Sequence, residues 1–121
     1  MKYLIPGPIV LAALLCAAPS AFAHAFLTHA SPAVGSTVNT PPTSLHLFFT
    51  EGVAPRFSSV QLLDTAGTPL HTGPLQTAQG GREVIVPVPE KLSSGKYTVV
   101  WHATAEDTHK TEGKFGFTVA P

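Results

Sequence analysis

The sequence predicts an all-β fold: a small sandwich or barrel of about seven strands. Several short segments alternate apolar and polar residues with a period of two, which is typical of strands that bury one face. Twelve prolines and ten glycines in 121 residues divide the chain into short elements, as in sandwiches and barrels. No segment of useful length shows the 3.6-residue apolar period of an amphipathic helix.

The first 23 residues are predicted to be a secretory signal peptide and no part of the fold. Lys2 is their only charged residue, an apolar stretch follows it, and residues 21–23 read Ala-Phe-Ala, a pattern typical of signal cleavage. A transmembrane helix is the alternative, but two prolines and a glycine interrupt an apolar stretch that is short for a bilayer. We therefore expect residues 1–23 to be removed on export and residues 24–121 to form one domain.

The predicted strands follow one another along residues 24–121, with turns between them. Clear alternation of apolar residues marks the segments 45–50, 60–63, 84–88, 97–104 and 115–119, and weaker strands are expected near 26–27 and over 69–76. Pro87 and Pro89 lack the backbone N–H of an interior strand, so we expect 84–88 to lie at a sheet edge. The aromatic residues expected in the core are Phe49, Tyr97, Trp101 and Phe117.

The charge and sulfur content excludes several function classes. Seven Lys and Arg residues balance seven Asp and Glu residues, and no basic cluster is present to neutralise nucleic-acid phosphates. The single cysteine, Cys16, and the single methionine, Met1, both fall in the predicted signal peptide. The exported domain would have neither a disulfide nor a soft sulfur ligand. No hydrolase motif such as G-x-S-x-G or H-E-x-x-H occurs.

The candidate chemistry lies in the histidines, all six of which follow residue 23. Cleavage there makes His24 the amino-terminal residue, whose α-amine and imidazole Nδ1 can close a six-membered chelate on one metal ion. Asp107 and His109 are two residues apart, and in an extended segment their side chains would face the same side. These nitrogens and one carboxylate, without sulfur, suit Cu(II), and zinc would also accept them.

Each of these features also has an ordinary structural interpretation. Every processed protein has some first residue, and an aspartate before a turn often bonds its own backbone. Neither feature alone predicts a metal site. Their occurrence together in one small domain without thiols favours metal binding.

The order of several motifs resembles the CopC/PcoC family of periplasmic copper-binding proteins. The motifs are His24-Ala25-Phe26-Leu27, Ser31-Pro32-Ala33-Val34-Gly35-Ser36, Leu45 to Glu51, Gly95 to Trp101, and Glu106 to Gly113. The resemblance implies a cupredoxin-like Greek-key sandwich that binds one Cu(II) per chain through His24, Asp107 and His109. It places Glu51 close to the metal, where we expect it to orient a ligand or a metal-bound water.

Two departures from the family pattern are relevant to copper. Some members carry a second site for Cu(I) in a methionine-rich loop, but the corresponding stretch here, residues 63–77, contains no methionine. We therefore expect no Cu(I) methionine site. The family often has proline after the histidine that corresponds to His109, whereas this chain has Lys110, which we expect to loosen the turn and weaken Cu(II) binding modestly.

The remaining histidines are expected to have smaller roles. His29 lies five residues after His24, on the opposite face if the segment is a regular strand, and is the candidate for an accessory ligand. His46 and His102 alternate with core positions and should point outward, and His71 should lie on the solvated surface.

The resulting prediction is a periplasmic protein of copper homeostasis and resistance that buffers or carries Cu(II) and is not an enzyme. We expect a monomer, and the resemblance implies handover to an inner-membrane partner of the CopD type. Two alternatives stay open. An amino-terminal histidine with a second histidine is also the histidine brace of lytic polysaccharide monooxygenases, although Asp107 as a further ligand would suppress redox cycling. A metal-free immunoglobulin-like interaction module would share the fold and need none of these ligands.

Overall fold

The computed structural model describes residues 24–121, so the predicted signal peptide lies outside the described residues. The strands are β1 (Leu27–Ser31), β2 (Thr37–Val38), β3 (Ser44–Phe49), β4 (Ser59–Leu63), β5 (Pro69–Leu70), β6 (Gln76–Ala78), β7 (Glu83–Pro87), β8 (Gly95–Thr104) and β9 (Lys110–Val119), with a short 3₁₀ helix at Pro55–Phe57. No helix in this part of the chain is long and apolar enough to cross a membrane.

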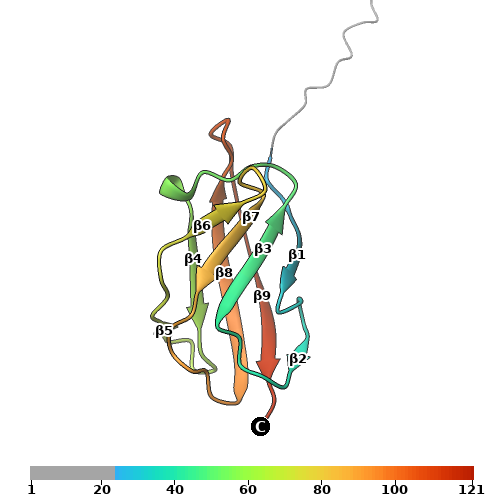
Figure 1. Cartoon of the computed structure of the whole chain (residues 1–121), viewed down its shortest axis with the longest axis vertical. Helices are drawn as coiled ribbons and strands as arrows, with labels where there is room; N and C mark the ends of the chain where they lie inside the picture. Colours follow the sequence, from blue (N-terminus) through green and yellow to red (C-terminus); the bar gives the residue numbers. More distant parts are fainter. Residues whose placement is uncertain (1–23) are drawn as a thin grey trace, which may run out of the picture.

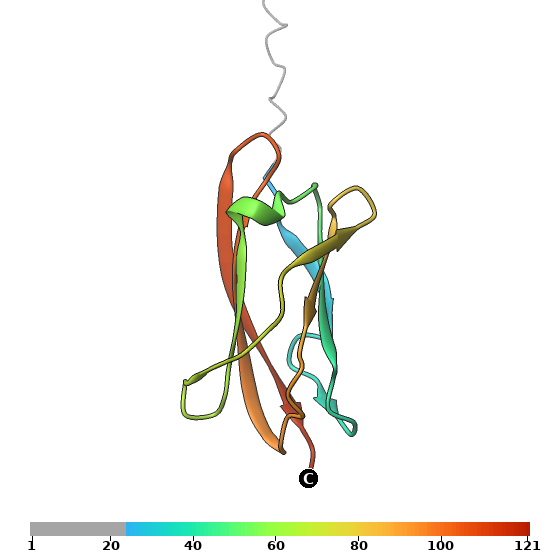
Figure 2. The same ribbon diagram turned by 60° about the vertical axis from the view of Figure 1, so that its left-hand side comes forward.

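The strands form two sheets that pack face to face (Figures 1 and 2). One sheet has the order β1-β3-β7-β6, and the other has the order β2-β9-β8-β4-β5. The all-β sandwich predicted from the sequence is confirmed, with nine strands where seven are expected. The strand β2 has only two residues, too few to show apolar alternation in the sequence. The expected strand over 69–76 divides into β5 and β6, which belong to different sheets.

The core lies between the sheets and follows the predicted alternation. Along β3, Leu45, Leu47 and Phe49 are buried, while the residues between them are half-buried. Phe49 packs edge-on against Trp101, with ring centroids 5.2 Å apart, and Tyr97 stacks on Phe117. The predicted aromatic core is confirmed, because all four rings are buried. Burying each such side chain stabilises the fold by roughly 1.5–3 kcal/mol.

The predicted edge position of residues 84–88 is wrong, because β7 lies between β3 and β6. β6 covers only the first part of β7, up to Ile85. Val88 donates its N–H toward the β3 side, to Thr43 O at 2.9 Å, so the nitrogen of Pro87 points to the other side, beyond the end of β6. The missing N–H of Pro87 therefore removes no hydrogen bond from the strand ladder, although β7 is an interior strand.

Strands β8 and β9 form the longest hairpin, paired from Gly95↔Val119 to Thr104↔Lys110. The loop of this hairpin lies at one end of the sandwich, together with the residues that precede β1 and the segment that follows β3 (Figure 1). The chain's carboxyl terminus lies at the opposite end. The fold thus brings residues 24–26, 50–51 and 105–109 to one end.

Candidate metal site

The loop that joins β8 to β9 is a tight turn and not the extended segment that the sequence predicts. Ala105 N–H donates to His109 O at 2.8 Å, and Thr108 N–H donates to Ala105 O at 2.8 Å. Thr108 has a φ of 78°, a left-handed conformation that a β-branched residue rarely adopts. Asp107 and His109 therefore face each other through the turn and not through strand alternation.

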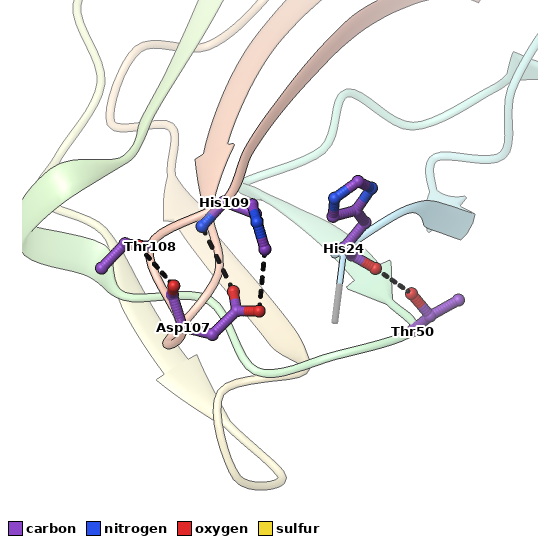
Figure 3. A network of polar contacts seen from close by, with 5 residues as sticks. All are labelled: His24, Thr50, Asp107, Thr108 and His109. Atoms are coloured by element: carbon purple, nitrogen blue, oxygen red, sulfur yellow. Dashed lines mark hydrogen bonds and ion pairs between the residues drawn. The ribbon is translucent and has the colours of Figure 1, made fainter. Parts of the chain in front are cut away.

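The carboxylate of Asp107 folds onto His109 (Figure 3). Oδ1 accepts the backbone N–H of His109 at 3.2 Å, and Oδ2 lies 2.9 Å from Nδ1 of the same residue. The backbone N–H of His109 is the main cause that lowers the pKa of the Asp107 carboxyl; burial opposes it, and the imidazole contributes further in the same direction. Asp107 is consequently a carboxylate at neutral pH, the form that binds a metal.

Hydrogen bonds from both sheets hold the segment that contains His24. Thr50, directly after β3, donates its hydroxyl to His24 O at 3.1 Å and accepts the backbone N–H of Phe26 at 3.0 Å. Thr111, in β9, donates to Ala25 O at 2.7 Å. The side chain of Ala25 is fully buried, so the segment is fixed on the sandwich immediately after His24.

This arrangement brings the imidazoles of His24 and His109 together from opposite ends of the sequence. Their ring centroids are 4.7 Å apart, with an interplanar angle of 70°. Because metal–imidazole bonds are about 2.0–2.1 Å long, the rings are close enough for one ion to bind a nitrogen of each. His24 also contacts the ring of Phe26, with centroids 5.8 Å apart.

The side chains of the predicted ligands lie close together in two pairs, His24 with His109 and Asp107 with His109. The three side chains do not form one cluster. Among residues 24–121, no three His, Cys, Asp or Glu side chains are grouped so as to hold a metal. The physical reason is that the Asp107 carboxylate is turned onto His109. The predicted set also includes the α-amine of His24, and this nitrogen belongs to a peptide bond until the chain is cut before residue 24.

The two auxiliary candidates lie in different surroundings. Glu51 directly follows Thr50 and is exposed, and its carboxylate makes no ion pair with the described residues. His29 is exposed in β1; its ring stacks on Phe48 with centroids 4.2 Å apart, and its Nδ1 lies 3.0 Å from the Thr28 hydroxyl. The roles predicted for Glu51 and His29 at the metal stay predictions.

Two of the other histidines pair with carboxylates on neighbouring strands. The sequence does not predict these pairs. His46 Nδ1 lies 2.6 Å from Glu83 Oε2, and His102 Nε2 lies 3.2 Å from Glu112 Oε1. Both histidines point out of the core, as predicted. His71 is exposed, also as predicted.

The sequence also does not predict that two threonines hold residues 24–26. Neither Thr50 nor Thr111 belongs to a residue type that binds copper. Their importance depends on which segments lie side by side, and no spacing in the sequence reveals that.

Comparison with known proteins shows the family to which the chain belongs. The CopC domain family matches residues 27–120. Protein YobA of Escherichia coli strain K12 is 38% identical over 102 residues, covering 84% of this chain and 82% of that protein. Copper resistance protein C of Xanthomonas campestris pv. juglandis is 33% identical over 121 residues, covering 95% of this chain and 94% of the relative.

Solved structures show the same relationship. The crystal structure of CopC from Methylosinus trichosporium OB3b superposes with a TM-score of 0.74 at 35% identity, covering 81% of this chain and 95% of that one. The family match begins at Leu27, so it contains the motifs identified in the sequence except residues 24–26, which include His24. The chain belongs to the CopC family.

Proposed function

We propose that the processed protein binds one Cu(II) ion between its amino terminus and the β8–β9 loop, and that it buffers or carries copper in the periplasm. Copper is its cargo. The observation that carries this proposal is the approach of the His24 and His109 rings to 4.7 Å, with the Asp107 carboxylate in hydrogen-bond contact with His109. The copper resistance protein to which the chain is similar supports the same role.

The chemistry of the donor groups supports Cu(II) over Cu(I). After cleavage, His24 offers its α-amine and one imidazole nitrogen, His109 offers a second imidazole, and Asp107 offers a carboxylate oxygen. Such nitrogen and oxygen ligands favour Cu(II), whereas Cu(I) favours thiolates and thioethers. Residues 24–121 contain neither cysteine nor methionine, so we propose one Cu(II) ion per chain and no methionine site for Cu(I).

We propose that export creates the complete site. Removal of residues 1–23 would convert the His24 nitrogen from a peptide nitrogen to an amine and permit the six-membered chelate. The exposed position of this end supports a further step, transfer of copper to an inner-membrane partner. Phe26, 56% exposed next to His24, is an apolar contact that such a partner could cover. We expect the protein itself to be a monomer.

Binding, and not catalysis, is the role that we propose. Two imidazoles and an amine alone would leave copper with an open position, but Asp107 supplies a fourth donor that stabilises Cu(II). Peroxide production driven by ascorbate tests this point. We expect the copper-loaded protein to produce peroxide no faster than an equal concentration of free copper, and a much faster rate would instead favour an oxidative enzyme.

The decisive experiment is a Cu(II) titration of the protein processed to begin at His24, with EPR at one equivalent. We expect stoichiometric binding and a single tetragonal signal with nitrogen hyperfine structure. The double variant Asp107→Ala, His109→Ala should lose the signal. His71→Ala is the matched control, because His71 is exposed and directly follows β5, which lies away from this end of the sandwich (Figure 1). Absence of stoichiometric binding would reduce the protein to an interaction module.

A further inference from the structure

We propose that Thr50 and Thr111 are positioning residues that hold the amino-terminal segment over His109 before copper arrives. This inference rests on the proposed function, since it assigns how the copper site is organised. Neither hydroxyl is a candidate ligand. Each acts through the backbone of residues 24–26, which precede β1 and so begin outside the strand ladder.

The hydroxyl of Thr50 has two roles at once. It donates its proton to His24 O at 3.1 Å and accepts the Phe26 N–H at 3.0 Å. A hydroxyl has one proton to donate and lone pairs to accept, so this side chain is suited to bridge a carbonyl and an N–H. The backbone of Thr50 adds a third bond, from its N–H to Phe26 O at 2.9 Å.

Thr111 holds the same segment from the other sheet. Its hydroxyl donates to Ala25 O at 2.7 Å, and it lies two residues after His109 in the strand that leaves the metal loop. The contact therefore ties the segment that carries His24 directly to the hairpin that carries His109. The Ala25 side chain is fully buried, and the two threonines hold the backbone on either side of it and at its own carbonyl.

The consequence for copper is preorganisation. A flexible amino terminus loses conformational freedom when it chelates a metal, and this loss weakens binding. A segment that already lies over His109 avoids most of that loss. Removing one hydroxyl should leave the donor atoms intact but let the amine and the His24 imidazole sample other positions.

The test uses the full-length gene, exported and processed, with the amino terminus confirmed as His24 by mass spectrometry. The variants are Thr50→Val and Thr111→Val, which keep the shape of the side chain and remove the hydroxyl. Thr50→Ser restores the hydroxyl. Thr118→Val is the matched control, since Thr118 lies at the far end of β9, opposite Lys96, and its side chain makes no hydrogen bond with the described residues.

Three measurements separate positioning from a general effect on folding. Competition titration gives the Cu(II) affinity, EPR reports the geometry at one equivalent, and amide hydrogen exchange of Phe26 in the metal-free protein reports the Thr50 contact. We expect Thr50→Val and Thr111→Val each to weaken Cu(II) binding about tenfold, as expected for one or two lost hydrogen bonds, with an altered EPR spectrum. Phe26 exchange should accelerate in Thr50→Val, and Thr50→Ser should restore both readouts.

The outcomes that would overturn the inference are distinct from those that test the proposed function. Absence of copper binding by the wild-type chain would overturn the proposed function and this inference with it. Wild-type binding that Thr50→Val and Thr111→Val leave unchanged in affinity and spectrum would overturn the inference alone. A loss of affinity equally large in Thr118→Val would also overturn it, because the effect would then come from the fold as a whole.

Discussion

Two histidine–carboxylate pairs in this protein have similar chemistry and different surroundings. His46 and Glu83 lie 2.6 Å apart on the outer face of a sheet, with side chains 33% and 13% exposed. His109 and Asp107 lie 2.9 Å apart in a hairpin turn, with side chains 55% and 37% exposed. The first pair joins two strands, whereas the second is contained in one loop.

The contacts around each pair show why only the pair of Asp107 and His109 is suited to give up its mutual hydrogen bond and bind a metal. His46 Nε2 lies 3.0 Å from the Ser44 hydroxyl, and Gln79 donates to the second oxygen of Glu83 at 3.0 Å, so all four polar atoms of this pair are occupied. The sheet holds the backbone on both sides. In the loop, the carboxylate of Asp107 bonds to the backbone and the ring of His109, and rotation of one side chain can release it to a metal.

Replacing each histidine with alanine gives the largest contrast. His109→Ala should weaken Cu(II) binding by more than the roughly 10- to 100-fold that is typical for loss of an outer contact, because it removes a ligand. His46→Ala should leave the affinity unchanged and lower the free energy of unfolding. Copper titration and chemical denaturation of the two variants, side by side, measure both effects. Equal copper affinities would contradict the assignment of His109.

Extending the amino terminus by one residue before His24 is the second test in order of size. The added residue returns the His24 nitrogen to a peptide bond and prevents the six-membered chelate, so Cu(II) affinity should fall by orders of magnitude. The fold should not change, because Ala25 and Phe26 keep their contacts. A titration of the extended protein measures this, and unaltered affinity would show that His24 is not the anchor.

Acid should weaken the metal site before it weakens the sheet. The nitrogen ligands must be deprotonated to bind Cu(II), so the affinity should decline as the pH falls from mildly basic to mildly acidic. Copper titrations across this range test the decline, and an affinity that stays flat from mildly acidic to mildly basic pH would contradict these ligands.

The stability of the fold should respond at lower pH. The hydrogen bond from His46 is the largest influence on Glu83 and lowers its pKa, against an opposing effect of burial. A folded-state pKa below the unfolded value stabilises the fold above the unfolded pKa, and this contribution is lost as the pH falls through the folded value, in the range below about 4. Denaturation from pH 6 to pH 3 should show a shallower acid decline in Glu83→Gln, and the same decline as in the wild type would contradict a role for this pair.

The smallest expected effect concerns the turn itself. Thr108 adopts a φ of 78°, which costs a side chain other than glycine or asparagine about 1 kcal/mol. Thr108→Asn should therefore raise the free energy of unfolding by about that amount, without loss of copper affinity. A thermal melt and a copper titration check the two statements. Destabilisation would show that the hydroxyl of Thr108, which bonds the carbonyl of Asp107, outweighs the relief of strain.

The same contrast explains how much the sequence could predict. Asp107 and His109 are two residues apart in the chain, so the sequence could pair them, and together with His24 they indicate a candidate site. Alternation likewise located the buried positions of β3 and β8. The pairing of His46 with Glu83 depends on the register between β3 and β7, which the hydrophobic pattern limits to a face but does not fix to a residue.

The features that the sequence predicts wrongly, or does not predict, have physical explanations of the same kind. A proline normally marks a sheet edge, but β6 ends before it reaches Pro87, so the missing N–H of Pro87 has no strand partner to lose within an interior strand. Residues 105–109 form a turn and not an extended segment, because the hairpin closes with one hydrogen bond from Ala105 N–H to His109 O and one from Thr108 N–H to Ala105 O. The sequence does not predict the roles of Thr50 and Thr111, since these roles depend on contacts between segments that are far apart in the chain.

The placement of the two termini has a practical consequence for handling the protein. The segment that precedes β1 and the carboxyl terminus lie at opposite ends of the sandwich (Figure 1). A purification tag, fluorophore or surface linker on Pro121 would leave the proposed copper site open to solvent, whereas any tag retained on the amino side of His24 would block that site. An electrode or sensor chip coated through the carboxyl terminus would present every molecule with its metal end outward.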